Sequence, residues 1–465
     1  MSETIPQTPT SNSNALDSRA KAVLKVAIVT LFIDLVGFSI IFPLFPAMLE
    51  YYGRVEADHG AFAQMNAGIA LFARVLGTSE GKSNIVLFGG LLGSLYSLLQ
   101  FVCAPILGRL SDHYGRRPVL LVSVCGTALS YLIWVFAGQF WLLLLARFVG
   151  GIMSGNISTA SAIVADVTNV RNRSKGMAFI GIAFGVGFIC GPVIGGLSAS
   201  IDLTAHLPQL AAWGINPFSM PALVALVMSL INIVLIAVML PETRPANERD
   251  AARIERTLNP ISALRGQHFP GVSQSNLAYF LFLTAFSGME FSLTFLAHER
   301  FGYTPRQNAM LLLFVGVVLA LVQGGYVQRK AHHVGPRRMT SQGLVFVVPG
   351  MILVGIAHSI PVLYAGLFFM AVGAAQVIPC LTSLVSLYTP PHVQGRVLGA
   401  FRSLGALARA IGPILACILF WRLGSQQAYV IAAVCSIAPL LITMRLPEPT
   451  SHDPQVLQEG AIEHV

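Results

Sequence analysis

The sequence predicts an all-α membrane protein whose twelve transmembrane helices form two pseudo-symmetric six-helix bundles. Hydrophobic residues make up 55% of the 465 residues and charged residues only 11%, whereas soluble domains carry roughly 25% charged residues. Apolar runs of about 20 residues, long enough to cross a bilayer as a helix, recur twelve times. Landmarks of the first half also recur in the second. Most of the chain therefore has lipid as its solvent.

The repeat divides the chain into halves. The Gly191-Pro192 pair of the fifth span recurs as Gly412-Pro413 in the eleventh. A Leu-Pro-Glu triplet follows both the sixth and the twelfth span, and acids recur near the first helix of each half. Such repeats place a substrate site near the midplane, where the two bundles meet. The expected divisions are a disordered cytosolic N-terminus (1–20), an N-terminal six-helix bundle (21–240), a cytosolic linker (241–275), a C-terminal six-helix bundle (276–446) and a cytosolic tail (447–465).

The distribution of charge argues against a nucleic-acid partner, although the net charge is +9. Twenty of the 29 Lys and Arg residues lie in or beside segments that face one side, six lie on the other side and three lie within spans. This bias is typical of the positive-inside rule. We therefore expect an integral multi-pass protein with both termini cytosolic, in the plasma membrane or an endomembrane.

The cysteines indicate neither a disulfide framework nor a metal site. All six fall within apolar spans, and none has metal-ligand spacing. No cofactor is expected. The polar N-terminus has no cleavable apolar core before the first span, which argues against a signal peptide.

The segment GRLSDHYGRR, between the second and third spans, contains Gly108, Asp112, Gly115, Arg116 and Arg117. The glycines allow close backbone approach or a turn, the aspartate can accept from N–H groups at a helix start, and the arginines can bridge carboxylates and carbonyl ends of helices. The arginines could also be simple topology markers. The pattern G-x-x-x-D-x-x-G-R-R resembles the loop 2–3 signature of the major facilitator superfamily, in which this loop would gate the cytosolic side.

Asp34 in the first span is a candidate proton or substrate site, because a carboxylate at membrane depth is costly unless it is paired or faces water. The alternative is a structural pairing with a neighbouring helix. The following segment, 50–84, has apolar residues at three- and four-residue steps. It predicts an amphipathic helix, lying on the membrane surface or packed as a lid.

The fourth and fifth spans carry two further signals. Arg147, followed by two glycines and by Asn156, should face the bundle interior, and R-x-x-G-G resembles the family motif associated with proton coupling. The alternative is an arginine held by carbonyls. In the fifth span, glycines four residues apart favour close helix packing, and the pattern resembles the family's antiporter signature. That signature comprises Gly187, Gly191, Pro192, Gly195 and Gly196.

The seventh and eleventh spans contain the remaining charged candidates. Glu290 shares a polar helix face with Ser287 and Thr294. Arg402 and Arg409 are seven residues apart and so lie about 20° apart around an ideal helix. Two arginines on one stripe require anions, either from the substrate or from Asp34 and Glu290 by internal pairing.

Segments such as SNIVLFGGLLGSLYSLLQF, FSGMEFSLTFL and FRSLGALARAIGP resemble the eukaryotic tetracycline-transporter-like group of this superfamily, the major facilitator superfamily domain-containing protein 10 group. The resemblance implies a secondary active transporter that moves amphipathic organic anions or drug-like solutes by alternating access, with proton antiport. The expected oligomeric state is a monomer. A facilitative carrier and a non-transporting scaffold or receptor remain alternatives. No nucleophile elbow or H-E-x-x-H pair is present, so an enzyme is not expected.

Overall fold

A computed structural model describes residues 18–75, 84–168, 170–244, 269–390 and 394–448. These ranges are helical, and no strand occurs in them. The helices of the first half are α1 (Ser18–Ser39), η1 (Phe42–Leu44), α2 (Phe45–Val55), α3 (Gly60–Val75), α4 (Asn84–Tyr114), α5 (Arg116–Val135), α6 (Phe140–Met153), α7 (Asn156–Val167), α8 (Val170–Ser198), α9 (Leu203–His206), η2 (Pro208–Trp213) and α10 (Ser219–Met239).

The second half repeats this order with different interruptions. Its eighth span contains a π-helical turn, η4, and its twelfth span is broken at Ser436. The helices are α13 (Val272–Phe301), α14 (Pro305–Leu321), η4 (Val322–Val327), α15 (Gln328–Val334), α16 (Pro336–Ile356), α17 (Ile360–Leu387), α18 (Gln394–Leu423), α19 (Ser425–Cys435) and α20 (Ile437–Met444).

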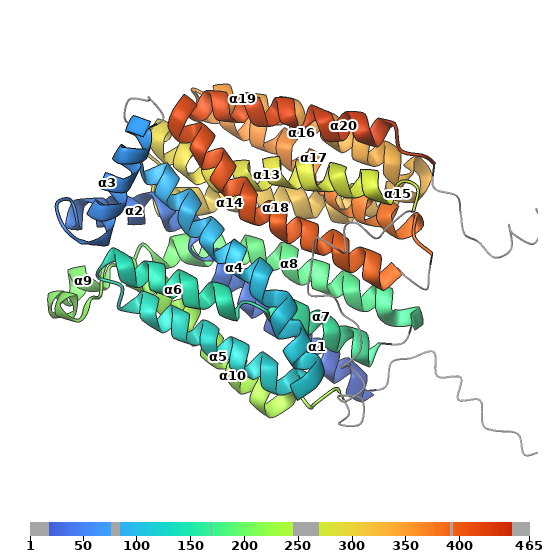
Figure 1. Ribbon diagram of the computed structural model, residues 1–465, viewed down its shortest axis with the longest axis horizontal. Helices are drawn as coiled ribbons and strands as arrows, with labels where there is room; N and C mark the ends of the chain where they lie inside the picture. The colour runs from blue at the N-terminus through green and yellow to red at the C-terminus, as the bar shows by residue number, and fades with distance from the viewer. Residues whose placement is uncertain (1–17, 76–83, 169, 245–268, 391–393, 449–465) are drawn as a thin grey trace, which may run out of the picture.

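Twelve helical segments of the described chain are long and apolar enough to cross a membrane. The predicted fold class is therefore confirmed. The first of these spans is divided into three segments, α1, η1 and α2, because Pro43 and Pro46 interrupt its helical hydrogen bonding. We call the end of the bundle where α1 begins and α20 ends the terminal end, and the opposite end, with α2, α3 and α9, the distal end (Figure 1).

The two halves use matching helix contacts. The Ser39 hydroxyl of α1 donates to the Gly187 carbonyl of α8 at 3.2 Å, and the Ser287 hydroxyl of α13 donates to the Ala408 carbonyl of α18 at 3.4 Å. Ser39 and Ser287 therefore occupy equivalent positions. It follows that Asp34 and Glu290 are not equivalents, because Asp34 precedes its serine by five residues and Glu290 follows its serine by three.

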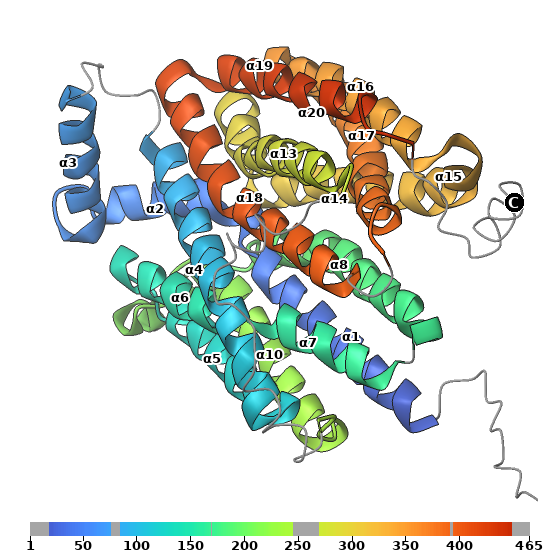
Figure 2. The same cartoon turned by 45° about the vertical axis from the view of Figure 1, so that its right-hand side comes forward.

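The halves meet near the distal end, where α4 packs on α18 and α8 packs on α14 (Figure 2). A Cβ added to Gly90 of α4 would lie 2.6 Å from Cys417 Cβ of α18, so the backbones approach closely. Nearer the terminal end, Gly185 of α8 and Gly399 of α18 lie on the helix faces that contact the other half at the distal end. A Cβ added to either glycine would have no neighbour within 4 Å. The facing surfaces of the two halves thus diverge toward the terminal end.

The predicted amphipathic helix after the first span is α3. Its side chains Phe62 and Ile69 are buried in the main core, so the helix packs against the protein. Buried Glu56 holds it there, because its carboxylate accepts the backbone N–H groups of Phe62 (2.9 Å) and Phe140 (2.7 Å), near the starts of α3 and α6. A carboxylate is favourable at both helix N-termini.

Several predictions concern residues outside the described ranges: the disorder of the N-terminus, most of the 241–275 linker and most of the 447–465 tail. The described flanks differ slightly from the expected boundaries, because α1 already begins at Ser18 and α13 begins at Val272.

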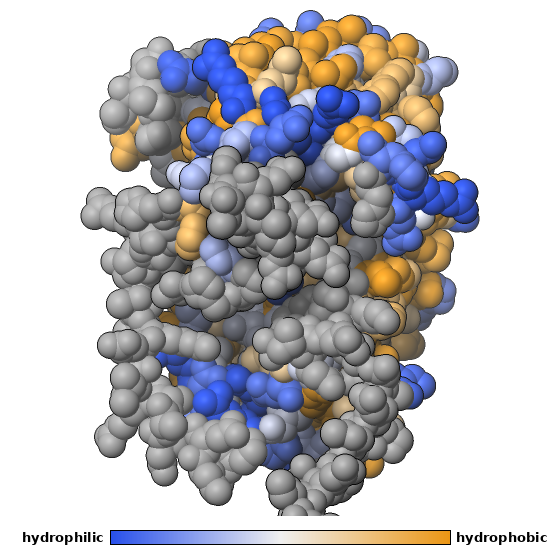
Figure 3. All heavy atoms as spheres, turned by 90° about the vertical axis from the view of Figure 1, so that its right-hand side faces the viewer, coloured by the Kyte–Doolittle hydropathy of each residue, from blue (hydrophilic) through white to orange (hydrophobic). Residues whose placement is uncertain are grey.

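Seen from the terminal end, hydrophilic side chains gather on the face of both bundles, and the upper rim is hydrophobic (Figure 3).

The glycine stripe of α8 gives a direct test of the packing. A Cβ at Gly195 would collide with the Ile40 carbonyl, whereas one at Gly185 would meet nothing within 4 Å. Gly195→Ala should therefore destabilise the protein by about 1–3 kcal/mol through overpacking, and Gly185→Ala should be neutral or stabilising by up to about 1 kcal/mol. Thermal unfolding in detergent measures both. Equal melting temperatures of the two variants would contradict the packing described.

Candidate functional site

Asp34 is bound by Asn156. The Asn156 amide nitrogen donates to Asp34 Oδ1 at 2.7 Å, which joins α1 to the start of α7. The fourth span breaks after Met153, so Asn156 stands at the first position of a new helix segment. Gly155 at this break has no room for a side chain, because an added Cβ would lie 2.6 Å from Leu107 Cβ of α4. Asp34 is half-buried, and Asn156 is fully buried.

Arg147 is 3% exposed and lies between two aromatic rings. Its guanidinium carbon is 5.2 Å from the Trp134 ring centroid and 5.6 Å from the Tyr96 ring centroid, within cation–π range. No carboxylate of the described residues lies within ion-pair distance of it, and its Nε has no hydrogen-bond partner among them. The aromatic faces therefore stabilise a buried cation that no described acid neutralises.

The C-terminal half contributes a second charged group. Arg402 and Arg409 are exposed although α18 is a membrane span, and Glu290 on α13 is half-buried. The charges of Arg409 and Glu290 interact, but their atoms are more than 4 Å apart, since no ion pair joins them. Tyr279 lies near both arginines and stacks on Phe401 with ring centroids 3.9 Å apart. The internal pairing of Arg409 with Glu290 is thus absent from this conformation.

Aromatic rings from both halves lie next to the two charged groups. Phe38 is one helical turn from Asp34 and contacts Tyr96 (4.8 Å) and Phe188 (5.8 Å). Phe291, next to Glu290, contacts Phe42 (6.3 Å) and Phe45 (5.1 Å) across the interface. We call Phe38, Phe42, Phe45, Phe188 and Phe291 the aromatic cluster. No hydrogen bond or ion pair within the described ranges connects the N-terminal charged group to the C-terminal one.

The glycine motif of α8 faces two helices. Gly187, Gly191 and Gly195 lie against α1 and the residue that follows it, where added side chains would collide with Leu35, Ser39 and Ile40. Gly196 faces α14 of the other half, with the Pro305 carbonyl 2.7 Å from an added Cβ. Pro192 lies inside α8, which continues through it. The motif thus positions one interface within the N-terminal half and one between the halves.

The gate segment is mostly helix, not loop. Residues 108–114 form the last turns of α4, and only Gly115 separates them from α5. Gly115 has φ = 106°, a region that favours glycine. Gly108 provides the close approach, because an added Cβ would lie 2.8 Å from Ser158 Oγ of α7. Gly335, which precedes α16, repeats the turn with φ = 82°.

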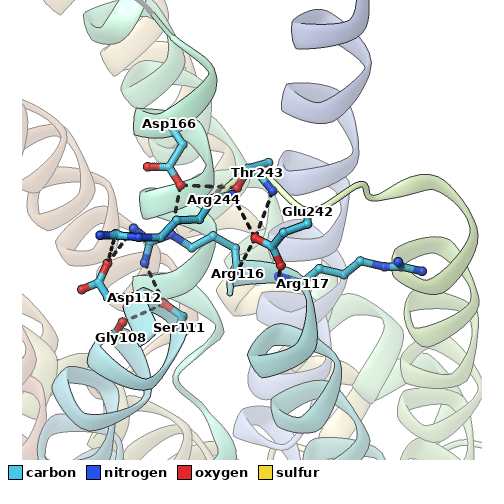
Figure 4. A network of polar contacts seen from close by, with 9 residues as sticks. All are labelled: Gly108, Ser111, Asp112, Arg116, Arg117, Asp166, Glu242, Thr243 and Arg244. Atoms are coloured by element: carbon cyan, nitrogen blue, oxygen red, sulfur yellow. Dashed lines mark hydrogen bonds and ion pairs between the residues drawn. The ribbon is translucent and has the colours of Figure 1, made fainter. Parts of the chain in front are cut away.

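Arg116 is the centre of a polar network at the terminal end (Figure 4). Its side chain is only 6% exposed, and its guanidinium pairs with Asp112 (2.8 Å) and Asp166 (2.9 Å). It also donates to Ser111 Oγ at 2.8 Å. Arg244 adds a second ion pair with Asp112 at 2.6 Å. One planar guanidinium therefore connects the end of α4 to the end of α7.

Glu242, after α10, accepts four backbone N–H groups. Those of Arg116 (2.9 Å) and Arg117 (3.2 Å) begin α5, and those of Thr243 (3.0 Å) and Arg244 (2.9 Å) follow the glutamate itself. The helix-start role that the sequence suggested for Asp112 therefore belongs to Glu242, and Asp112 binds arginines instead. Arg117 points away and donates to the Ala237 carbonyl of α10 at 2.6 Å.

The C-terminal half keeps only part of this arrangement. Arg337 donates to the Met444 carbonyl at 2.5 Å, as Arg117 does to Ala237. Pro336 occupies the position of Arg116 and has no N–H to donate. Glu448, which corresponds to Glu242, makes no hydrogen bond to a described residue and is exposed.

Three residue sets at this site were not predicted as functional: Glu242, Asp166 and Arg244; Tyr96 and Trp134; and the aromatic cluster. The Leu-Pro-Glu triplet was a detectable signal for Glu242, but it was used only as evidence of the repeat. No sequence signal marks which aromatic rings will contact Arg147.

The family model described as Major Facilitator Superfamily matches residues 27–413 and 332–461. The chain belongs to the major facilitator superfamily. It is 37% identical over 451 residues to human major facilitator superfamily domain-containing protein 10, and the aligned region covers 92% of this chain and 94% of that protein. It is 28% identical over 395 residues to the Escherichia coli tetracycline resistance protein, class E, which covers 85% of the chain and 87% of that protein.

The fold matches solved structures of the same family. A crystal structure of the human organic anion transporter MFSD10 (TETRAN) superposes with a TM-score of 0.71 at 36% identity, and covers 92% of this chain and 100% of that one. A D-xylose-proton symporter matches with a TM-score of 0.70 at 15% identity, which supports the fold alone. The chain is therefore an integral multi-pass membrane transporter and not an enzyme.

The terminal-end network yields a stability prediction. Glu242→Ala should destabilise the protein by about 1–3 kcal/mol, because it removes the acceptor of the N–H groups that begin α5. Glu448→Ala is the matched control and should change the melting temperature little, since Glu448 is exposed. Thermal unfolding of both variants measures the difference. An effect of equal size would mean that the Glu242 contacts contribute no specific stability.

Proposed function

We propose that this transporter carries amphipathic organic anions by alternating access, in exchange for protons. The observation that carries the proposal is Arg409 on α18. Arg402 and Arg409 are exposed within a membrane span, and Arg409 has no carboxylate within ion-pair distance among the described residues. A cation that forms no ion pair within a span favours an external anion.

The amphipathic character of the substrate is supported by the aromatic cluster. It provides ring faces from both halves near Glu290 and Asp34, where an apolar or aromatic part of a substrate can pack. The relative solved as a crystal structure is described as an organic anion transporter, at 36% identity. Arg147, with its aromatic partners, supplies a further positive charge on the N-terminal side.

For proton exchange we propose Asp34 and Glu290 as the groups that bind and release protons. Asp34 has only a neutral amide as its hydrogen-bond partner, and Glu290 makes no ion pair within the described ranges. A buried carboxyl group becomes neutral on taking up a proton, so its protonation changes the charge that the arginines experience.

The cycle that we propose is a rocking of the two halves about their interface. The contacts at the distal end and the divergence toward the terminal end correspond to a conformation that is open toward the termini. We further propose that the terminal end is cytosolic, since it carries the basic segments, that the chain acts as a monomer, and that the network around Arg116 helps to close this end in the opposite conformation.

Neutralising Arg409 should weaken anion transport. Arg409→Gln should lower the flux of a sulfonate dye into proteoliposomes by about tenfold, because one hydrogen bond to a charged group contributes roughly 1.5–3 kcal/mol. Arg422→Gln, an exposed arginine near the end of the same helix, is the matched control and should keep the wild-type flux. Equal loss in both variants, or in neither, would exclude Arg409 as the anion site.

Proton exchange should appear as a response to a pH gradient. With the membrane potential clamped, an acidic lumen should accelerate uptake of the external dye, because protons then leave as the anion enters. Asp34→Asn should abolish this acceleration but keep exchange of dye for dye. Equal wild-type rates with and without the gradient would leave an uncoupled carrier as the function.

A further inference from the structure

The distal end contains an ion pair that joins the two halves. His298, in the last turn of α13, places Nε2 2.8 Å from Glu50 Oε1 of α2. The side chains are 26% and 41% exposed, so the solution at this end can reach both. The pair therefore connects the first helix of the C-terminal half directly to the first span of the N-terminal half.

The hydrogen-bond partner of the other ring nitrogen of His298, Nδ1, is set by the turn that ends α13. Gly302 is left-handed, with φ = 63°, and the N–H groups of Gly302 and Tyr303 return to the carbonyls of His298 (3.0 Å) and Ala297 (3.3 Å). This closing turn brings the Tyr303 carbonyl to 2.8 Å from His298 Nδ1. A carbonyl can only accept, so Nδ1 must carry a hydrogen.

The contact with Glu50 consequently needs a second proton. An ionised carboxylate also only accepts, and with Nδ1–H committed, a neutral ring would present the Nε2 lone pair to Glu50. The 2.8 Å contact is attractive only when one proton lies between Nε2 and Oε1, on the imidazole or on the carboxyl group. Loss of that proton leaves two acceptors facing each other.

Other charged groups near this end do not replace the proton. None of those on the surrounding elements forms an ion pair with His298 or Glu50 in the described chain. They include Arg54 on α2, Glu56 directly after α2, Asp202 before α9, Glu299 and Arg300 on α13, Arg306 on α14, His358 before α17 and Arg422 on α18. Arg300 is directed elsewhere, to Ser425 Oγ (2.9 Å) and the Ala357 carbonyl (2.9 Å).

A second polar contact crosses the interface at the same end, and its groups do not titrate. Trp421 of α18 donates to Asn84 Oδ1 at 3.0 Å, and Asn84 donates to Asn66 of α3 at 2.6 Å. Because indole and amide groups keep their charge state over the physiological range, the pH sensitivity of this closure falls to His298 and Glu50.

We propose that His298 and Glu50 form a proton-binding site in the distal gate, at which a proton from the compartment facing that end holds the two halves together. Protonation closes the distal end, and deprotonation removes one of its attachments. This inference rests on the transporter fold and on the contacts at the distal end. It stands whether or not Asp34 and Glu290 exchange protons for substrate.

The test is a distance measurement on the full-length protein. Spin labels at Leu207→Cys in the N-terminal half and Gln427→Cys in the C-terminal half, in a background without native cysteines that still transports, report separation of the distal ends. Raising the pH from 5.5 to 8.5 should increase the ratio of open to closed distal ends by about fivefold, the effect of one exposed ion pair.

Three variants distinguish a proton site from a merely structural contact. Glu50→Gln should stay closed at pH 8.5, because its amide can donate to a neutral Nε2. His298→Gln should lose the pH response, and His358→Gln, which changes another exposed histidine at the same end, should keep it. A constant wild-type ratio, or a pH response retained in both Glu50→Gln and His298→Gln, would overturn the proposal. Dye flux plays no part in this readout, so failure of the proposed substrate or coupling is distinguished from failure of the gate site.

Discussion

Close backbone contact between α1 and α8, and its repeat between α13 and α18, is the constraint on which the rest of the molecule depends. In both places a glycine on one helix lies against a serine on the other, with the serine hydroxyl bound to a carbonyl across the interface. Helices in lipid gain little from the hydrophobic effect between them, so they rely on such packing and on hydrogen bonds. Each helix pair is therefore a rigid unit within its own half. The two units can move relative to each other only where their facing surfaces separate.

The charged groups follow from this arrangement. On the N-terminal side Asp34 and Arg147 are held by neutral partners, an amide and two aromatic rings, which stabilise them without cancelling their charges. On the C-terminal side Arg409 and Glu290 are neighbours that do not pair in this conformation. Keeping acid and base apart is costly in a membrane, and a transporter can use that cost because an incoming ion or a movement of the halves relieves it.

Much of the fold could be predicted from length and hydropathy alone, since a membrane span needs a fixed number of apolar residues. The glycine stripe of α8 was also visible, because its spacing of four residues defines one helix face. Glu242 was not predictable as the partner of α5, because the N–H group that it accepts lies 126 residues away in the sequence. The same limit applies to Arg147, whose ring partners come from α4 and α5, and to Asp34 and Glu290, whose apparent equivalence the matched serine contacts exclude.

The aromatic cluster has a consequence for the membrane itself. Rings from both halves meet on the distal side of Asp34 and next to Glu290, and they leave no polar side chain among their own members. A chain of hydrogen-bonded waters needs polar partners to stay ordered, and the five phenylalanine rings offer none. We therefore expect the resting carrier to leak few protons through this layer, although it keeps titratable groups inside the bilayer.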